Sequence, residues 1–450
     1  MRLLLPTGLA TGLIAATLLT APGAQAAADS CQGRTATVVG AGQYGLTGTE
    51  GDDVIVTNGA DGVQALGGND LICITNAPPS RTDISLDAGA GDDVVDASAA
   101  TSGVTVELGA GSDTYTGSAY DETVHGGTNG YDGSPVGDTE RDSITTGSGG
   151  DDHVVSGSDR AVPNGDAVVL GADDGVGFGS SVGWFGPMAD GGRLDGGGGA
   201  RLAFGLGSGR VVVDAATGTL TEDGRVDLRW TGFDDFSVGG GNAPAPSLFG
   251  FRGTDRAEEL DLRFRDAHTG RQRIDMGGGD DTLWLGHDDN TGASGSSYSG
   301  GHGEDHVAMW AGNSLDLDLA SGRMETRHEG RTFRLRLDRF ETQLVGAKKL
   351  VLKGMKKGEE LRFYACRATV HGRGGADDIR QSRGDDYFEA GLRCKPRKFR
   401  LFGDKGKDTL QGSTDNDVLV GGPGRDAING NGGRDRCSGE KLRSCEIRLR

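Results

Sequence analysis

The chain has 450 residues and a net charge of -20; 83 of its residues are glycine and only 35% are hydrophobic. Without any periodicity, such a composition is typical of a low-complexity or disordered segment, because it offers little apolar surface for an ordinary globular core. Length alone suggests about three domains. After residue 26 no apolar stretch is long enough for a transmembrane helix, which argues against a protein that spans a membrane with helices.

The first 26 residues have the features of a secretory signal peptide. The basic start Met1-Arg2 is followed by a mostly apolar run from Leu3 to Leu19, and Ala24-Gln25-Ala26 supplies an A-x-A cleavage site. We therefore expect residues 1–26 to be removed and the mature chain to be extracellular, either released or associated with the cell wall.

A short pattern, G-x-D-x-U with U apolar, recurs from residue 51 onward. Many intervals between its aspartates fall between 17 residues (Asp53 to Asp70) and 24 (Asp281 to Asp305), which predicts one solenoid coil per copy with small loop insertions. We expect residues 27–166 to form a first solenoid of such repeats and residues 167–192 to be an irregular insertion. The aspartates of all the looser copies are Asp53, Asp70, Asp93, Asp113, Asp152, Asp281, Asp305, Asp377 and Asp386.

Residues 193–298 and 299–390 resemble two copies of a longer β-unit. Val213-Asp214 in the first unit aligns with Leu317-Asp318 in the second, and Glu258-Glu259-Leu260 aligns with Glu359-Glu360-Leu361. Strict alternation of apolar and charged residues, as in Phe333–Asp338, indicates strands with one buried face.

The last segment, 391–450, contains four consecutive nine-residue blocks without an insertion: Gly403–Gln411, Gly412–Val420, Gly421–Asn429 and Gly430–Ser438. Each block has an apolar residue or cysteine at its eighth position and an aspartate at its sixth, namely Asp408, Asp417, Asp426 and Asp435. Glycine dominates the first and fourth positions. This pattern, G-G-x-G-x-D-x-U-x, resembles the hemolysin-type (repeats-in-toxin) calcium-binding repeat of secreted bacterial proteins.

The resemblance implies that calcium is the cofactor and that the sixth-position aspartates, in strict and looser copies alike, are its ligands. Glycine at positions one, two and four permits positive φ and lets carbonyl oxygens turn toward a shared space. Calcium accepts about six to eight oxygen ligands in a tolerant geometry, whereas zinc prefers Cys or His. Two blocks close one coil, so we expect Asp408 to stack over Asp426 and Asp417 over Asp435, with coils about 4.8 Å apart.

The predicted fold class is therefore all-β: a right-handed parallel β-roll or β-helix solenoid with calcium-binding turns and a regular nonapeptide roll at the C-terminus. Neighbouring coils of a solenoid bury their U residues jointly, which compensates for the low apolar content of each coil.

Six cysteines in an exported chain suggest three disulfides, although several connectivities remain open. Proximity in the sequence favours Cys31 with Cys73, Cys366 with Cys394 and Cys437 with Cys445.

Charge is distributed unevenly along the chain. Residues 321–400 hold 21 Lys and Arg against 11 Asp and Glu, whereas residues 1–320 hold 16 against 47. An acidic first part repels itself until cations neutralise it, which links folding to calcium. The basic stretch is either a solvated strand face or a site for an anionic polymer.

Three fragments match catalytic motifs only superficially. The two histidines of His302–His306 have the spacing of a zinc protease but lie in a repeat loop rather than on a helix. Gly179–Gly183 fits G-x-S-x-G, a match expected by chance in so glycine-rich a chain. Paired carboxylates such as Asp280-Asp281 resemble a glycosidase pair but are explained by a repeat ligand and its neighbour. No catalytic residue is therefore assigned.

These observations predict a secreted, non-enzymatic calcium-binding repeat protein that acts as a calcium-stabilised structural or adhesive module. Two alternatives remain open: a parallel β-helix lyase or hydrolase acting on polysaccharide, and a module that binds an anionic polymer without turnover. The expected partners are calcium ions and a cell-wall or extracellular polysaccharide, with no nucleic-acid partner.

Overall fold

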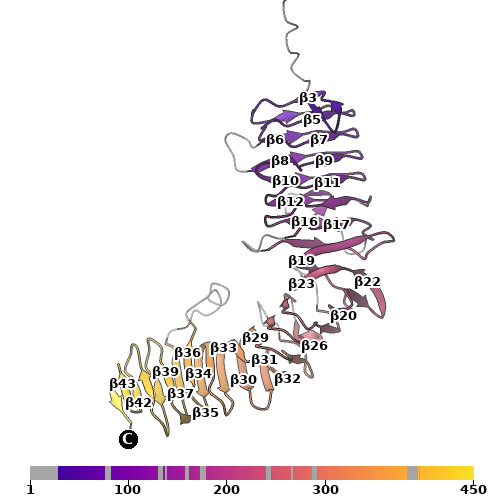
Figure 1. Ribbon diagram of the computed structural model, residues 1–450. Coiled ribbons are helices and arrows are strands. Elements are labelled where there is room, and N and C mark those ends of the chain that lie inside the picture. Colours follow the sequence, from indigo (N-terminus) through magenta and orange to yellow (C-terminus); the bar gives the residue numbers. More distant parts are fainter. Residues whose placement is uncertain are drawn as a thin grey trace, which may run out of the picture.

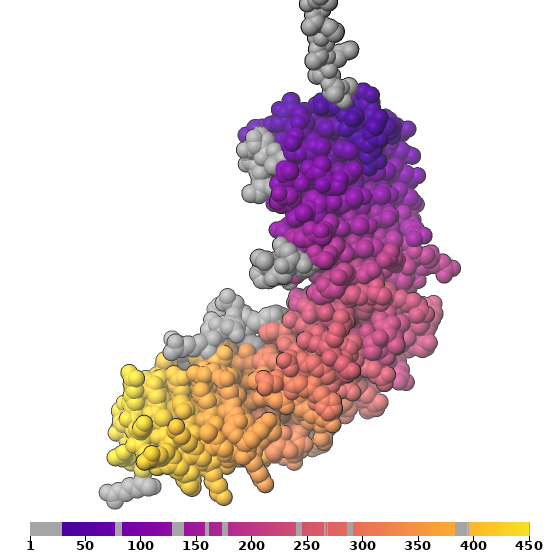
Figure 2. All heavy atoms as spheres, in the orientation of Figure 1, coloured from indigo at the N-terminus to yellow at the C-terminus, as the bar shows by residue number. Residues whose placement is uncertain are grey.

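The computed structural model describes residues 29–76, 83–129, 135–136, 139–157, 162–172, 179–239, 245–264, 267–285, 291–382, 394 and 396–449. The predicted signal peptide and Asp386 lie outside these residues. The described chain winds into a long stack of β-coils that bends between its N-terminal and C-terminal parts (Figures 1 and 2). Its only helical element is the short 3-10 turn η1 (Ala267–Thr269), and no helix in this part of the chain is long and apolar enough to cross a membrane.

A first parallel ladder forms one side of the N-terminal coils. It ends where β19 pairs with β23, and its strands are β3 (Val38–Val39), β5 (Val54–Val56), β7 (Leu71–Cys73), β9 (Val94–Asp96), β11 (Thr114–Thr116), β15 (Ser143–Thr145), β17 (Ala167–Val169), β19 (Arg193–Phe204) and β23 (Thr231–Val238).

A second parallel ladder runs through nearly the whole molecule. After β4 (Leu46–Thr47), β6 (Gly62–Gln64), β8 (Asp83–Asp87), β10 (Gly103–Glu107), β12 (Glu122–His125), β16 (His153–Ser156) and β18 (Ser181–Trp184), it continues through β19 and β23. It then proceeds through β25 (Glu259–Leu262), β27 (Thr282–Leu285), β29 (His306–Trp310), β33 (Thr342–Lys353), β34 (Glu360–His371), β36 (Asp378–Gln381), β39 (Thr409–Gln411), β41 (Ala427–Asn429) and β43 (Lys441–Arg443).

A third ladder replaces the first in the C-terminal part. In pairing order it contains β22 (Arg225–Arg229), β21 (Thr219–Glu222), β20 (Arg210–Asp214), β24 (Leu248–Arg252), β26 (Arg271–Asp275), β28 (Ser297–Ser299), β32 (Arg331–Asp338), β31 (Arg323–His328) and β30 (Ser314–Asp318). It continues with the second halves of β33 and β34, then β37 (Lys398–Phe402), β40 (Val418–Val420), β42 (Arg436–Ser438) and β44 (Ile447–Arg448).

Antiparallel pairing interrupts the third ladder twice. The strands β20, β21 and β22 form one antiparallel meander, and β30, β31 and β32 form another. These meanders occupy corresponding places in the two longer units expected from the sequence. The remaining short pairs are antiparallel β1 (Ser30–Cys31) with β2 (Arg34–Thr35), antiparallel β13 (Thr128–Asn129) with β14 (Pro135–Val136), and parallel β35 (Gly374–Gly375) with β38 (Lys405–Gly406).

The core is a column of apolar side chains inside the coils. The described residues at the eighth repeat position are all buried, from Ile55 and Ile72 near the start to Ile428 and Cys437 near the end. Backbone pairing aligns Leu410 with Ile428, so successive C-terminal coils are in register as expected. The prediction of an all-β parallel solenoid is therefore confirmed.

A cluster of aromatic side chains fills the inside of the coils where the molecule bends. Phe204, Trp230, Phe236 and Phe251 form a chain of ring contacts, with centroids 6.3, 5.7 and 5.5 Å apart. The four residues lie in or next to β19, β22, β23 and β24, where the first ladder ends and the third begins. Large rings fill the interior at this junction, which keeps the core continuous although the ladder changes.

Residues 167–192, expected to be irregular, contribute two regular strands. Both β17 and β18 continue their ladders, and Val168, Val182 and Trp184 point into the core. Three or four residues that alternate between inward and outward positions are too few to indicate a strand in the sequence. They are enough to form one here, because the neighbouring coils supply a pairing strand on each side.

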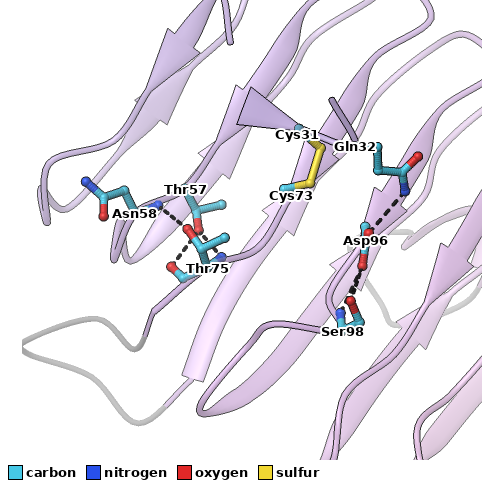
Figure 3. Close-up of a disulfide and its surroundings, with 8 residues drawn as sticks. All are labelled: Cys31, Gln32, Thr57, Asn58, Cys73, Thr75, Asp96 and Ser98. Carbon is cyan, nitrogen blue, oxygen red and sulfur yellow. Dashed lines mark hydrogen bonds between the residues drawn. A yellow bond between two sulfur atoms is a disulfide. The ribbon is translucent and has the colours of Figure 1, made fainter. Parts of the chain in front are cut away.

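All three disulfides expected from sequence proximity are present: Cys31–Cys73, Cys366–Cys394 and Cys437–Cys445. The first fastens the β1–β2 hairpin to β7, and the neighbouring Gln32 amide donates to the Asp96 carboxylate of β9 at 3.1 Å (Figure 3). Val54, Val56 and Leu71 are buried beneath this hairpin, which covers apolar outward positions of the first coils.

Candidate metal-binding turns

The sixth-position aspartates stack directly on one another along each ladder. The Asp408 main-chain N–H donates to Asp426 Oδ1 at 3.0 Å, and Asp417 N–H donates to Asp435 Oδ1 at 2.8 Å, with 18 residues between partners in both cases. Asp377 N–H donates in turn to Asp408 Oδ1 at 2.9 Å. The predicted stacking is thus confirmed, and each carboxylate uses one oxygen to bind the coil before it.

The N-terminal aspartates form a column of the same kind in the first ladder. Bonds of 2.7–2.9 Å run from each main-chain N–H to the next carboxylate, through Asp53, Asp70, Asp93 and Asp113. The column then continues to Asp142 and Asp166, which sequence reasoning missed. Both have the D-x-U core, but Glu140 and Asn164 replace the fourth-position glycine that was used as the signal.

Glutamates occupy equivalent positions in the second ladder. Glu258 N–H donates to Asp281, Asp305 N–H donates to Glu341, and Glu359 N–H donates to Asp377, at 2.8–3.1 Å. At the C-terminal end, Glu440 and Glu446 accept from the last two aspartates, Asp426 and Asp435, at 2.8 and 2.7 Å. The missed signal is an acid, whether Asp or Glu, two residues before an inward position of a strand.

The second carboxylate oxygen is without a hydrogen-bond partner at nine of the predicted ligands. Each of these oxygens is buried, although an unpaired buried acceptor is costly and a carboxylate more so. The nine residues are Asp70, Asp93, Asp113, Asp281, Asp305, Asp377, Asp408, Asp426 and Asp435, in every case at Oδ2.

Two other predicted ligands have both oxygens satisfied by the protein itself. Asp53 accepts from Thr37 Oγ1 at 2.7 Å, and its Oδ2 accepts both the N–H and the hydroxyl of Thr49. Asp417 accepts in the same way from Phe399 N–H and from the N–H and hydroxyl of Ser413. We call such turns capped and the nine others open.

The residue at the second repeat position, four before the acid, distinguishes the two kinds of turn. In all nine open turns this residue has positive φ, as in Gly89 (104°), Gly422 (104°), Asp404 (66°) and Asn431 (68°). In the capped turns it is Thr49 or Ser413, neither of which has positive φ, and its N–H faces the carboxylate. Positive φ at this position therefore accompanies the loss of the main-chain donor.

Glycine at the first position has a different role from the one expected. Gly403 and Gly421 do not have positive φ. A Cβ at Gly403 would overlap Asp408 Oδ2, and one at Gly421 would overlap Asp426 Oδ2. The Gly421 carbonyl oxygen lies 2.7 Å from the same missing Cβ at Gly403, so a carboxylate and a carbonyl oxygen converge there. The glycine is needed for space rather than for backbone conformation.

Burial raises the pKa of several open carboxylates. It brings the pKa of Asp93, Asp113, Asp281 and Asp377 to about 7. In the two capped turns, the Thr37 hydroxyl lowers the pKa of Asp53, whereas burial raises the pKa of Asp417. The open turns thus hold oxygens that lack both a hydrogen-bond donor and a neutralising charge.

The last two predicted ligands differ from the others. Asp152 donates its main-chain N–H to Ser180 Oγ at 3.0 Å, because a serine replaces the acid in the next coil; its own Oδ1 is buried and unpaired. Asp386 lies outside the described residues. Among those that are described, no three His, Cys, Asp or Glu side chains gather as a metal site would require. A cation at an open turn would therefore rely on main-chain oxygens as well as on carboxylate.

An oxygen-only site with one unpaired carboxylate oxygen and neighbouring carbonyls suits a hard divalent cation such as calcium. The molecule is thus a parallel β-solenoid with rows of acidic, cation-compatible turns. Residues 402–437 match the RTX calcium-binding nonapeptide repeat, in four copies. The C-terminal coils are therefore hemolysin-type calcium-binding repeats, as the sequence pattern predicts. No curated protein matches the chain.

Proposed function

We propose that the protein is a secreted, calcium-stabilised solenoid with a structural or adhesive role and no catalytic centre. The observation that carries this proposal is the row of nine buried carboxylate oxygens without a hydrogen-bond partner. A fold that leaves so many acceptors unpaired is stabilised if a cation occupies the turns, because desolvated carboxylates otherwise oppose folding.

The open turns are the proposed calcium sites. Asp408, Asp426 and Asp435 lie within the matched nonapeptide repeats, so both the family match and the unpaired oxygens support them as ligands. By the same geometry we assign Asp70, Asp93, Asp113, Asp281, Asp305 and Asp377. We retain Asp152 for its unpaired oxygen, whereas Asp53 and Asp417 belong to capped turns and are proposed to support the column without binding metal. Bound calcium supplies positive charge to carboxylates that the column holds in place.

Secretion is supported by the predicted signal peptide and by the disulfides. All six cysteines are paired, which is typical of an oxidising compartment. Extracellular calcium modules bind with Kd values of about 10⁻⁴–10⁻³ M, so the turns would fill outside the cell and stay empty in the cytosol.

An enzymatic role has weaker support. His153 Nδ1 lies 2.8 Å from Ser181 Oγ, a contact that a serine nucleophile would need. The same contact recurs between His306 Nδ1 and Thr342 Oγ1 at 2.9 Å, and both pairs are cross-strand neighbours at outward positions. Ladder packing explains both contacts, so we assign no catalytic function to either.

Calcium titration of the full mature chain tests the proposal. We expect saturable heat of binding and a rise in the thermal unfolding midpoint with calcium, and a much smaller effect with magnesium, which prefers a rigid octahedral site. Equal midpoints in chelator and in about 5 mM calcium would contradict calcium stabilisation.

A further inference from the structure

The outward face of the third ladder is rich in arginine and lysine. Alternate residues of β26 and β37 are exposed, and they include Arg271, Arg273, Lys398 and Arg400, while the residues between them point into the core. These side chains come from distant parts of the sequence but share one continuous sheet face. The solenoid thus converts scattered basic residues into a long positive surface.

At the bend this surface is hollowed into a groove of about 700 Å³. The groove crosses β20, β24, β26, β28 and β32, which are neighbours in the third ladder. Gly250 and Ser297, small residues at outward positions, leave its floor low, whereas Arg210, Arg273 and Arg336 line it with long side chains. Five strands about 4.8 Å apart give it a length of about 19 Å. Two of these strands, β20 and β26, are visible at the bend in Figure 1.

Several of the groove's guanidinium groups are available to a ligand. Arg210 and Arg273 are exposed and form no ion pair with any described residue. Arg252 and Arg336 contact Asp214 and Asp338 at 3.5 and 2.8 Å, but their side chains remain 72% and 62% exposed. Exposed pairs of this kind are weak, so a ligand carboxylate can compete for the same arginines.

The mixture of charges in the groove distinguishes between polyanions. Arginine forks match carboxylates in a bidentate manner. Asp214, Asp275 and Asp338 also line the groove, and their oxygens can accept hydrogen bonds from hydroxyl groups but repel a densely charged phosphate chain. The lining contains a single aromatic residue, Phe251, which is buried at 3% exposure and offers no stacking platform for nucleic-acid bases. A polymer with both carboxylates and hydroxyls fits best.

We propose that this groove binds a segment of a uronate-bearing acidic polysaccharide, with carboxylates on Arg210, Arg273 and Arg336 and hydroxyls on the interspersed aspartates. The proposal deepens the adhesive role suggested above and rests on it for the extracellular location of the polymer. It does not depend on the calcium turns, because none of the proposed calcium ligands lines the groove.

The test measures binding of short oligogalacturonates to the full mature chain by calorimetry, at fixed calcium and low salt. We expect the Arg273→Ala/Arg336→Ala double variant to raise Kd at least about tenfold, since each loses a charge-assisted contact. Gly250→Tyr is expected to weaken binding similarly while keeping every arginine. A Cβ at Gly250 meets its nearest atom at 3.4 Å and the backbone does not require glycine, so this variant fills the groove without disturbing the core.

The matched control is Arg400→Ala/Arg436→Ala, which removes two exposed arginines of the same ladder outside the groove. We expect its Kd to stay within about twofold of the unchanged protein. Equal losses of affinity in the groove variant and the control variant would mean that general electrostatic attraction, and not the groove, binds the polymer. Tighter binding of polyphosphate or DNA than of oligogalacturonate would overturn the choice of polymer. Absence of oligogalacturonate binding would also overturn the proposal. A calcium-dependent thermal midpoint measured on the same samples would show that only the ligand assignment had failed.

Discussion

The N-terminal coils up to β19 and the C-terminal coils from β20 onward build the same carboxylate column but differ on both sides of it. Inside the open turns, the first repeat position is Ala88 before Asp93 and Leu108 before Asp113, whereas it is Gly403 before Asp408 and Gly421 before Asp426; Met276 before Asp281 is the exception in the C-terminal part. On the outward face, β11 of the first ladder presents Thr114 and Thr116, whereas the third ladder, which replaces it, presents arginine and lysine. The column of carboxylates thus needs only one acid in each coil. The first repeat position sets how much space a cation has in the turn, and the outward strand residues set the charge of the surface, independently of the column.

Breaking the feature that both parts share should have the largest effect. Ile428→Asp in the C-terminal part and Val95→Asp in the N-terminal part each place a charge at a buried core position. We expect each to cost more than about 4 kcal/mol of unfolding free energy, and added calcium should not restore the coil. Chemical denaturation at low and high calcium measures both effects. Asp426→Ala is the control, because high calcium should restore the stability of this variant by mass action. If added calcium stabilised Asp426→Ala and Ile428→Asp equally, the assigned inward and turn positions would be wrong.

Exchanging the first-position residues sharpens the difference between the two parts. Gly421→Ala should destabilise the protein by about 1–3 kcal/mol and weaken calcium binding, because the new methyl group overlaps Asp426 Oδ2. Ala88→Gly should cost about 0.5–1 kcal/mol in chelator but strengthen calcium binding at the Asp93 turn. Calorimetric titration of each variant against the parent checks the opposite signs. Weaker calcium binding in both variants would show that this position does not control cation space.

Open and capped turns can be compared within the nonapeptide repeats. Asp426→Asn should reduce calcium affinity about tenfold at its turn, because the unpaired oxygen loses its charge. Asp417→Asn should leave calcium binding unchanged and lower stability by about 1–3 kcal/mol, since an amide cannot accept from Phe399 and Ser413 as the carboxylate does. Binding isotherms and melting curves separate the two outcomes. A loss of calcium sites in Asp417→Asn would contradict the distinction.

Stability should depend on pH in opposite directions with and without calcium. The folded-state pKa of Asp93, Asp113 and Asp377 is raised to about 7, so the folded chain binds more protons than the unfolded chain between about pH 4 and 7. In chelator, unfolding free energy should therefore fall by at least about 1 kcal/mol as pH rises from 5 to 8. At saturating calcium it should rise over the same range, because the cation binds the ionised carboxylates. Urea unfolding at several pH values tests this reversal, and parallel pH profiles under the two conditions would contradict it.

The smallest expected effect is the absence of turnover. At saturating calcium we expect no depolymerisation of pectate, alginate or hyaluronan, measured as new reducing ends or unsaturated products. The groove of the third ladder makes this a demanding test, because a β-helix lyase would also gather arginines on one face. Turnover lost on substitution of Asp281, Arg334, Arg336 or Lys353, with fold and calcium affinity intact, would favour that enzyme instead.

Much of the fold and part of the site could be predicted from the sequence because they are local. The D-x-U core located buried residues such as Ile72 and Leu410, and the nine-residue spacing placed Asp408 beside Asp426. Requiring glycine at the fourth position nevertheless hid Asp142 and Asp166, since the column depends on the acid and not on that glycine. Restricting the acid to aspartate hid Glu258 and Glu359 for the same reason.

The sequence by itself determined the coil period, the inward apolar residues and the calcium-repeat character of the last four blocks, and proximity in the chain favoured the three disulfide pairs. Each of these follows from chemistry within one coil or between adjacent coils. Only the tertiary structure decided which turns are open, because an oxygen is unpaired only if no neighbouring N–H or hydroxyl reaches it, as Ser413 reaches Asp417. The tertiary structure also decided the third ladder and its groove. Ser297 of β28 pairs with Arg273 of β26 on one side and with Arg336 of β32 on the other, which brings the two arginines to the same groove. No local sequence pattern specifies this pairing.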